Sequence, residues 1–383
     1  MKKSFADILS SLDSTRDRKL AAKLPSWAEA GCTVPSGLSL EQCSSELTGS
    51  YKAGLIEKGT VLCDLTGGLG VDSWSFSKVC KQVHYFERND ILEAAAKENF
   101  ARLGASNIGT TCTTVDAATE LPECDWIFLD PARRAADGSG KKVFLLEDCT
   151  PDVLTLLPML WSRAGHIMLK LSPMADISMV AKRLNARCIE VLGRSCLKEV
   201  HVVGLSGEVK ELLCILDSSW DGNWKITAAS LAADGYPEEF TFSPEEETAA
   251  IAEYARPEEL VPLAYLFEPD PVLLKAGAFK FPCSRFGLKK LDTFTHLYTG
   301  TQPVGELFKT FEIVDALPFD KRSIAEFSTR YPGADVTSRN LPLSSDALRA
   351  KLSSKGGGAK ATDIHIFGLS CAGSRLLIAA RRK

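Results

Sequence analysis

The sequence predicts an α/β fold in which a mostly parallel sheet ends in an antiparallel hairpin and is followed by a smaller α+β region. From Val61 onward, short apolar runs alternate with helical patterns, which is typical of right-handed βαβ crossovers and a parallel sheet. The apolar runs EVHVVGL and ELLCIL are separated only by SGEVK. Because this connection is too short for a parallel crossover, we expect these two strands to pair antiparallel.

The chain of 383 residues is too long for one ordinary core, and its texture changes along its length. We therefore predict a helical region at 1–50, the sheet domain at 51–218, a linker and a small segment at 219–305, and a separate α/β domain at 306–383. The first region should begin with a helix, because Phe5, Ile8, Leu9 and Leu12 share one face at helical spacings.

The predicted strands of the sheet domain are apolar throughout, as strands covered on both faces should be. In chain order, the predicted elements are VLCDL, Trp74–Val79, VHYFE, Ile91–Leu103, IGTTCTTV, DWIFLD, Pro151–Trp161, GHIMLKL and Ile177–Leu184. The elements predicted after residue 306 are FEIVDA, Lys321–Arg330, ADVTSRN, Ser344–Leu352, DIHIFGL and RLLIAAR. This β-α-β-α-β-β order predicts a small domain with its own sheet.

The composition indicates a soluble globular protein, with 45% hydrophobic and 25% charged residues. No apolar run is long enough to cross a membrane, and the N-terminus lacks the apolar core of a secretory signal. The 12 cysteines are scattered, with no C-x-x-C pair and no Cys/His cluster at zinc spacing. We therefore expect a cytoplasmic protein with no metal and no membrane partner, in which most cysteines pack in the core.

The net charge of −4 conceals an asymmetry along the chain. Residues 306–383 contain 13 Lys and Arg against 8 Asp and Glu, a surplus of +5 that leaves −9 for the first 305 residues. The last region is therefore able to meet a polyanion although the whole chain is acidic. A surplus of this size is, however, more often a solvated surface.

The first strand end reads VLCDLTGGLGVD, and ligands of open parallel sheets bind beyond such carboxyl ends. Asp64 ends the strand, and Gly67, Gly68 and Gly70 form a turn whose backbone can approach a ligand closely. The dinucleotide frame G-x-G-x-x-G that starts at Gly68 ends in serine, which disfavours nicotinamide cofactors. S-adenosylmethionine carries a sulfonium and an ammonium, for which the carboxylates of Asp64 and Asp72 are suited.

The next two strand ends also offer carboxylates. Glu87 closes VHYFE, where it can accept hydrogen bonds from both hydroxyls of a ribose. Asp116 in TTVDAA would lie near an adenine ring. Each acid taken alone is more often a surface or capping residue, but their positions after successive strands favour a ligand site.

The fourth strand end is DWIFLDPARR, in which Asp130 and Pro131 precede Ala132, Arg133 and Arg134. It resembles the D-P-P-x and N-P-P-x tetrapeptides of methyltransferases that act on nucleobases and amide nitrogens. A target amine sheds positive charge as it attacks a methyl carbon, so it needs acceptors such as an Asp side chain and a carbonyl held by proline. The alanine in place of a second proline leaves the target atom open. Arg133 either grips an anionic substrate or pairs with a nearby acid, and for Arg134 we favour the second role.

The fifth strand end, HIMLKLSPMADI, contains Lys170, which is either a substrate-binding or a structural lysine. No cysteine nucleophile lies beside it, so direct methyl transfer to nitrogen or oxygen is preferred. Further along, FKFPCSRFGLKK places Lys280, Arg285, Lys289 and Lys290 among phenylalanines. These cations would hold RNA phosphates while a ring stacks on a base, unless the phenylalanines form a small core.

Motifs over nearly the whole chain resemble one bacterial family. They are KLPSWA, LSLEQCSSE, YKAGLI, DLTGGLGVD, DPARR, LEDCTPD, KLSPMADI, GEVKELL, EPDPVLLKAGAF, RFGLKKL, THLYT and VTSRNLPLS. The chain resembles the Bacteroidetes-type class I S-adenosylmethionine-dependent methyltransferases that carry a C-terminal THUMP-like domain. The resemblance implies a Rossmann-like methyltransferase domain, a small ferredoxin-like segment within 219–305 and an α+β THUMP-like domain at 306–383.

The residues and the resemblance together predict a cofactor site and a catalytic loop. The predicted cofactor-binding residues are Asp64, Thr66, Gly67, Gly68, Gly70, Asp72, Glu87 and Asp116, to which the resemblance adds Gln42, Ser44 and Ser45. The implied catalytic loop consists of Asp130, Pro131, Ala132 and Arg133. THUMP domains present tRNA to attached enzymes, so the resemblance implies structured RNA as the substrate. Methylation of a protein or small metabolite, and RNA binding without catalysis, stay open as alternatives.

Overall fold

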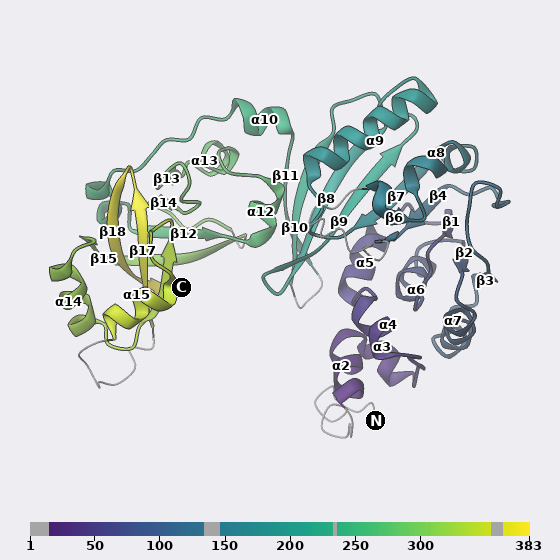
Figure 1. The fold of residues 1–383 in the computed structure, drawn as a ribbon, viewed down its shortest axis with the longest axis horizontal. Helices are drawn as coiled ribbons and strands as arrows, with labels where there is room; N and C mark the ends of the chain where they lie inside the picture. Colours follow the sequence, from purple (N-terminus) through teal and green to yellow (C-terminus); the bar gives the residue numbers. More distant parts are fainter. Residues whose placement is uncertain (1–14, 134–145, 233–235, 306, 354–362) are drawn as a thin grey trace. The chain divides into compact units, whose positions relative to one another are not determined.

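The computed structural model describes residues 15–133, 146–232, 236–305, 307–353 and 363–383. The chain forms two compact units, Met1–Pro237 and Glu238–Lys383 (Figure 1). The helix predicted over Phe5 to Leu12 lies outside the described residues, as does Arg134. No described helix is long and apolar enough to cross a membrane.

The first unit begins with short helices, and serines start two of them. The helices are α2 (Thr15–Lys23), α3 (Pro25–Glu29), α4 (Gly37–Gln42) and α5 (Glu46–Gly54). Ser36 and Ser45 accept hydrogen bonds from the backbone of the first turns of α4 and α5 in capping boxes, which satisfies amides that would otherwise lack partners. Trp27 anchors this region, because its side chain is fully buried against Trp74 of the sheet domain.

The sheet of the first unit is mostly parallel and contains the predicted antiparallel hairpin. Its strands are β1 (Val61–Asp64), β2 (Gln82–Glu87), β3 (Ile108–Cys112), β4 (Trp126–Leu129), β7 (His166–Leu171), β8 (Leu197–Leu205), β9 (Glu208–Asp217) and β10 (Lys225–Leu231). With β11 (Pro237–Phe242), which starts at the last residue of this unit, they form a sheet of the order β11-β10-β8-β9-β7-β4-β1-β2-β3. Strand β9 is antiparallel to both β7 and β8, which confirms the hairpin.

Helices cover both faces of this sheet, as a parallel sheet requires. They are α6 (Val71–Ser77) and α7 (Asp90–Arg102), which lie with α5 on one side, and α8 (Val153–Trp161) and α9 (Ile177–Leu192), which lie on the other (Figure 1). On the α5 and α6 side, Leu62, Val83, Phe128 and Met168 from four strands pack around Phe76. The carboxyl ends of β1, β2, β4 and β7 therefore meet at one edge.

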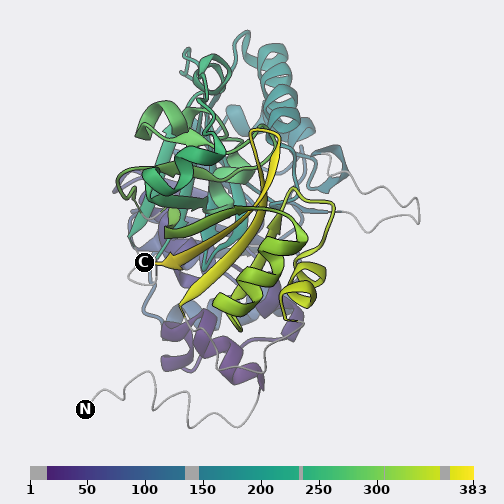
Figure 2. The same ribbon diagram turned by 90° about the vertical axis from the view of Figure 1, so that its left-hand side faces the viewer.

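The second unit is built on one mixed sheet. Its strands are β12 (Tyr265–Pro269), β13 (Lys289–Lys290), β14 (Tyr298–Gly300), β15 (Phe308–Pro318), β16 (Asp335–Arg339), β17 (Ile364–Cys371) and β18 (Ser374–Arg382), in the order β13-β14-β12-β15-β18-β17-β16. Its helices are α10 (Pro244–Ala249), α11 (Leu260–Leu263), α12 (Pro271–Ala276), α13 (Phe281–Phe286), α14 (Lys321–Arg330) and α15 (Ser345–Leu352). Figure 2 shows α14 and α15 lying against β17 and β18 (yellow).

The predicted elements after residue 306 are present in the predicted order, and they share a sheet with the segment before them. Strand β15 pairs antiparallel with β18 on one side and with β12 on the other. The segment before residue 306 and the segment after it therefore share one sheet and one core. The sequence does not show this pairing, because a strand edge needs a partner but the pattern of residues does not indicate which strand supplies it.

Two features of the first unit do not follow from the sequence pattern. Strand β10 was assigned to the linker at 219–305, but it pairs parallel with β8 and belongs to the first sheet, so the first unit extends to Pro237. The structure also joins Cys188 of α9 to Cys196 in a disulfide, which the spacing of the cysteines does not indicate. Cys63 and Cys214 are buried in the core, as expected.

We predict that a chain ending at Gly305 cannot fold its second unit. Such a chain lacks β15, so β12 loses the partner that pairs with it from Tyr265 to Pro269. Hydrogen exchange should then show unprotected amides in β12 and β14, while the amides of β1 and β4 stay protected. A chain ending at Pro237 is the control, and it should keep the first unit folded. Native-like protection of β12 in the chain ending at Gly305 would contradict the shared core.

Candidate functional site

The turn after β1 is shaped by packing as well as by any ligand. A Cβ on Gly67 would lie 2.0 Å from a ring carbon of Tyr85, and a Cβ on Gly70, at φ +91°, would lie 2.7 Å from the Phe100 ring. Both positions therefore require glycine without a ligand. Gly68, at φ +56°, meets only a backbone oxygen at 3.8 Å, so it is the position where the backbone is most open to an approaching group.

Asp64 ends β1 and is buried, with 1% of its surface exposed. Its Oδ1 accepts the Thr66 amide at 3.1 Å, and its Oδ2 accepts the Ser73 hydroxyl at 2.6 Å. Burial, the largest cause, and the nearby carboxylates of Asp72 and Asp130 raise the pKa of Asp64 to about 7. Among the described residues Asp64 makes no ion pair, although it lies in a group of charged side chains.

Glu87 ties the end of β2 to the same turn. Its Oε2 accepts the Gly68 amide and its Oε1 accepts the Asn89 amide, both at 2.8 Å. The Tyr85 hydroxyl donates to the Gly68 carbonyl at 2.6 Å. The half-buried Glu87 therefore holds the turn in place, and its second lone pairs remain able to accept further hydrogen bonds.

Asp130, which follows β4, is held from two sides. Its backbone amide donates to the Thr66 hydroxyl at 2.6 Å, and its Oδ2 lies 2.5 Å from Nζ of Lys170 in β7. The next residue, Pro131, is buried. Ala132 and Arg133 form β5 (Ala132–Arg133), a short strand that pairs with β6 (Cys149–Thr150). The ends of β1, β4 and β7 are thus joined by hydrogen bonds between their own residues.

Asp72 at the start of α6 joins further residues to this edge. Its Oδ2 accepts the Ser44 hydroxyl at 2.8 Å and lies 4.0 Å from Lys170 Nζ. Its Oδ1 lies 3.2 Å from Nζ of Lys52 in α5, which is fully buried and also contacts Glu211 Oε1 of β9 at 2.5 Å. Sequence reasoning did not assign a role to Lys52 or Glu211, although they lie in the motifs YKAGLI and GEVKELL, because neither stands at the carboxyl end of a strand.

The charges of these neighbours decide the ionisation of the group. Burial alone would raise the pKa of Asp72, but the ammonium groups of Lys52 and Lys170 lower it below its ordinary value. Burial alone would likewise lower the pKa of Lys170, but Asp130 and Asp72 raise it. Lys170 therefore stays protonated and points at carboxylates of its own chain. This geometry assigns it a structural contact with Asp130 and leaves its role as a substrate ligand unsupported.

The arrangement fits a ligand that combines positive charge with a ribose. Asp64 is a buried carboxylate without a cationic partner among the described residues, so a bound cation would lower the cost of ionising it. Glu87 stands at the next strand end with acceptor capacity left. Asp64, Gly68 and Glu87 would therefore hold S-adenosylmethionine, whose charged groups and hydroxyls match these acceptors.

The other predicted cofactor residues lie farther from this chemistry. Gln42 is exposed at the end of α4, and Ser45 caps α5. Asp116 is exposed and accepts hydrogen bonds from Ala118 and Thr119 within its own turn. Ser44 is the member of this loop that the structure brings into the site.

The basic and aromatic patch around residues 279–290 is only partly exposed, and several of its cations have partners within the chain. Lys290 is 3% exposed and donates to the Thr293 carbonyl at 2.6 Å. Lys280 donates to the Thr248 carbonyl, and Lys289 pairs with Glu259 at 3.2 Å. Phe281 and Phe286 both pack against Phe240. Arg285 is exposed. The buried ammonium of Lys290 therefore has a backbone partner, and the role of the patch as an RNA surface stays a prediction.

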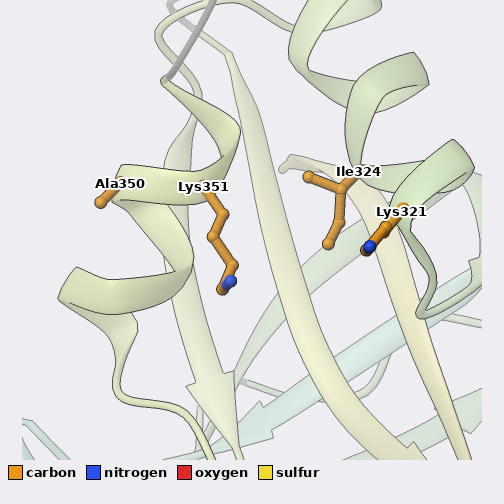
Figure 3. Close-up of a pocket in the computed structure, with 4 residues that line it drawn as sticks. All are labelled: Lys321, Ile324, Ala350 and Lys351. Carbon is orange, nitrogen blue, oxygen red and sulfur yellow. The ribbon is translucent and has the colours of Figure 1, made fainter.

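A hollow of about 420 Å³ lies on the second unit. It is lined by Lys321 and Ile324 of α14 and by Ala350 and Lys351 of α15 (Figure 3). Two lysines from neighbouring helices thus border one shallow apolar surface. Sequence reasoning predicted the positive charge of this region but not the residues that present it.

Comparison with known proteins indicates the family of the chain. The ferredoxin-like domain family matches residues 265–307, and the THUMP domain-like family matches residues 308–382. A crystal structure of a proposed methyltransferase from Porphyromonas gingivalis W83 is 32% identical, with a TM-score of 0.83, over 100% of this chain and 95% of that chain. No curated protein matches the chain.

More distant solved structures match part of the chain. The precorrin-6y C5,15-methyltransferase of Geobacter metallireducens GS-15 is 14% identical with a TM-score of 0.33, over 50% of this chain and 94% of that chain. The SMU.1697c protein of Streptococcus mutans is 13% identical with a TM-score of 0.31, over 45% of this chain and 96% of that chain. No conclusion rests on these two.

We predict that Asp64→Asn stabilises the protein more at high pH than at low pH. The pKa of Asp64 is about 7 in the folded chain and about 4 in an unfolded one. Its contribution to stability is therefore complete below about pH 4 and is lost as the pH rises through about 7. Between about pH 5 and pH 8, the gain of the variant in free energy of unfolding should grow by about 2–3 kcal/mol.

Urea unfolding at both pH values measures this difference for Asp64→Asn. Asp116→Asn is the matched control, because Asp116 is an exposed carboxylate that likewise accepts hydrogen bonds within a turn. The control should show no comparable growth. An equal gain for Asp64→Asn at both pH values would show that Asp64 is not a protonated buried acid near neutral pH.

Proposed function

This chain belongs to the family of class I methyltransferases that carry a ferredoxin-like segment and a THUMP-like domain, and we propose that it transfers a methyl group from S-adenosylmethionine to structured RNA. The observation that carries the proposal is the meeting of Asp64, Glu87 and Asp130 at one turn. Three acceptors from three strand ends are joined there by the turn of Thr66 and Gly68.

The cofactor would be held by the ends of β1 and β2. Asp64 offers its carboxylate to positive charge, Gly68 allows a close approach of the backbone, and Glu87 offers lone pairs to ribose hydroxyls. When bound, S-adenosylmethionine supplies an electrophilic methyl carbon. Ser44, which precedes α5, donates a hydrogen bond to Asp72 of α6 at the same edge of the sheet.

Asp130 is the proposed acceptor for the target group. Lys170 engages its Oδ2, which leaves Oδ1 to accept a hydrogen bond from an amine that gains positive charge during transfer. The buried Pro131 fixes the backbone that follows. This arrangement supports nitrogen as the target, because a carboxylate stabilises the charge that develops on an attacking nitrogen.

RNA would dock on the second unit. The surplus of positive charge lies in residues 306–383, and Lys321 and Lys351 border its hollow (Figure 3). Lysines on helices bind phosphate oxygens without reading the sequence of the nucleic acid. Exposed Arg285 belongs to the same unit and adds a further cation.

The proposed reaction predicts that label from S-adenosylmethionine enters RNA. The protein should be incubated with labelled cofactor and with separate RNA, protein and metabolite fractions. Asp130→Ala should lower label transfer roughly 100-fold, as expected when one interaction with the transition state is lost. Calorimetry should show that this variant still binds the cofactor, whereas Glu87→Ala should bind it more weakly.

The outcomes of this experiment separate the parts of the proposal. Label in the protein or metabolite fraction alone would exclude RNA as the substrate and retain the methyltransferase. Undiminished transfer by Asp130→Ala would remove Asp130 from the mechanism. A wild-type protein that binds no S-adenosylmethionine would refute the cofactor assignment.

The docking proposal predicts that Lys321→Gln with Lys351→Gln weakens RNA binding. The slope of log affinity against log salt should fall in magnitude by about 2, one for each lost phosphate contact. Lys58→Gln with Lys81→Gln is the control, because these exposed lysines lie just before β1 and β2, at the opposite edge from the candidate site. Equal salt slopes for both double variants would place the RNA elsewhere.

A further inference from the structure

Five charged side chains at the site form a continuous line in which the sign of the charge alternates. The order is Glu211, Lys52, Asp72, Lys170 and Asp130. The successive distances between nitrogen and oxygen atoms are 2.5, 3.2, 4.0 and 2.5 Å. The line runs from β9 through α5 and α6 to β7 and ends at the residue that follows β4.

The inner members of this line are shielded from water. Lys52 is fully buried, Glu211 is 3% exposed, and Asp72 and Lys170 are each 9% exposed. Burial raises the pKa of Glu211, while the ammonium of Lys52 acts in the opposite direction. A buried ion pair is seldom the most stabilising choice for such a position, since an apolar pair of the same size often serves better. The position of Lys52 therefore calls for a reason other than stability.

Lys52 reaches no atom of the turn at 64–70 or of Asp130 in the described structure. Its Nζ contacts Ser44 Oγ at 3.1 Å, Asp72 and Glu211. Its helix is held close to α6, because a Cβ on Gly49 would lie 2.5 Å from Ser75 Oγ. Any effect of Lys52 on the site must therefore pass through the side chains that it contacts.

The two distances from Lys170 to its carboxylate partners indicate how Lys52 acts on the site. Lys170 lies 2.5 Å from Asp130 but 4.0 Å from Asp72, although both are carboxylates within its reach. Asp72 already has Lys52 at 3.2 Å. The ammonium of Lys52 partly compensates the negative charge of Asp72, which weakens the attraction between Asp72 and Lys170. The attraction between Lys170 and Asp130 is therefore the stronger of the two.

We propose that Lys52 is a positioning residue for Asp130, because its charge satisfies Asp72 and so keeps Lys170 on Asp130. The proposal rests on the role of Asp130 in the proposed function, but the contact itself can be tested without it. Glu211 in turn holds Lys52 in place. The N-terminal helix α5 would thus contribute to the site through a charge that touches no ligand.

The test compares two variants that differ only at Lys52. Glu211→Gln removes the outer carboxylate and keeps Lys52 beside Asp72. Lys52→Met with Glu211→Gln removes the ammonium as well, without leaving Glu211 as a buried charge. Lys52→Met alone is avoided, because it leaves both of its carboxylate partners uncompensated and is expected to fold poorly.

A crystal structure of each variant should be determined without added cofactor. In Glu211→Gln, Lys170 should stay on Asp130. In the double variant, Lys170 should move toward Asp72 into hydrogen-bonding distance, about 2.8–3.2 Å, and leave Asp130. A double variant in which Lys170 remains on Asp130 overturns the proposal. A double variant that does not fold also overturns it, because Lys52 would then serve the fold itself.

Label transfer supplies the second readout. The double variant should transfer methyl groups about tenfold more slowly than Glu211→Gln, a usual size for coupling within one charged network. In an Asp130→Ala background the same change should have no further effect, because Lys52 acts through Asp130. An equal further loss in that background would contradict the proposal. If no protein form transfers label, the proposed function fails, while the movement of Lys170 still decides the positioning role.

Discussion

The candidate site depends on the crowding of carboxylates at one edge of a parallel sheet. Parallel strands bring their carboxyl ends together, and in this chain those ends carry Asp64 and Asp130, with Asp72 on the following helix. Such a group repels itself unless cations lie within it, because each uncompensated charge in a buried site costs several kcal/mol. Lys52 and Lys170 supply that compensation. Asp64 is left without an ion pair among the described residues, and burial together with the carboxylates of Asp72 and Asp130 raises its pKa.

The glycine turn shows how one motif can satisfy packing and binding together. Gly67 and Gly70 are required by the rings of Tyr85 and Phe100, whereas Gly68 keeps open space beside it. The rings press the turn against β2, and Glu87 fixes it there through the Gly68 amide. The position of the open residue therefore follows from the packing of its neighbours. A glycine-rich pattern alone does not distinguish these roles, which is why the sequence could predict the turn but not the contribution of each glycine.

The sequence predicted those features that depend on local pattern. The alternation of strands and helices, the hairpin of β8 and β9, and the acids at the strand ends are all local, and the structure contains them. The pairing of Lys52 with Glu211 could not be predicted, because they are 159 residues apart and the motifs that contain them do not indicate that the two segments meet. The pairing of β15 with β12 and of β10 with β8 is likewise decided by which edges meet in three dimensions. Strand pattern contains no information on that choice when both strands are apolar.

The basic residues show that the number of charges in a segment differs from the number exposed at the surface. The patch at Lys280 to Lys290 is rich in cations, but Lys290 donates a hydrogen bond to a backbone carbonyl and Lys289 forms an ion pair with Glu259. Lys321 and Lys351 stand 30 residues apart in the sequence, yet they border one hollow because α14 and α15 pack side by side. A polyanion meets only the charges that the fold leaves at its surface. The net charge of a region can therefore be counted from the sequence, but the surface that would bind RNA depends on how the helices pack.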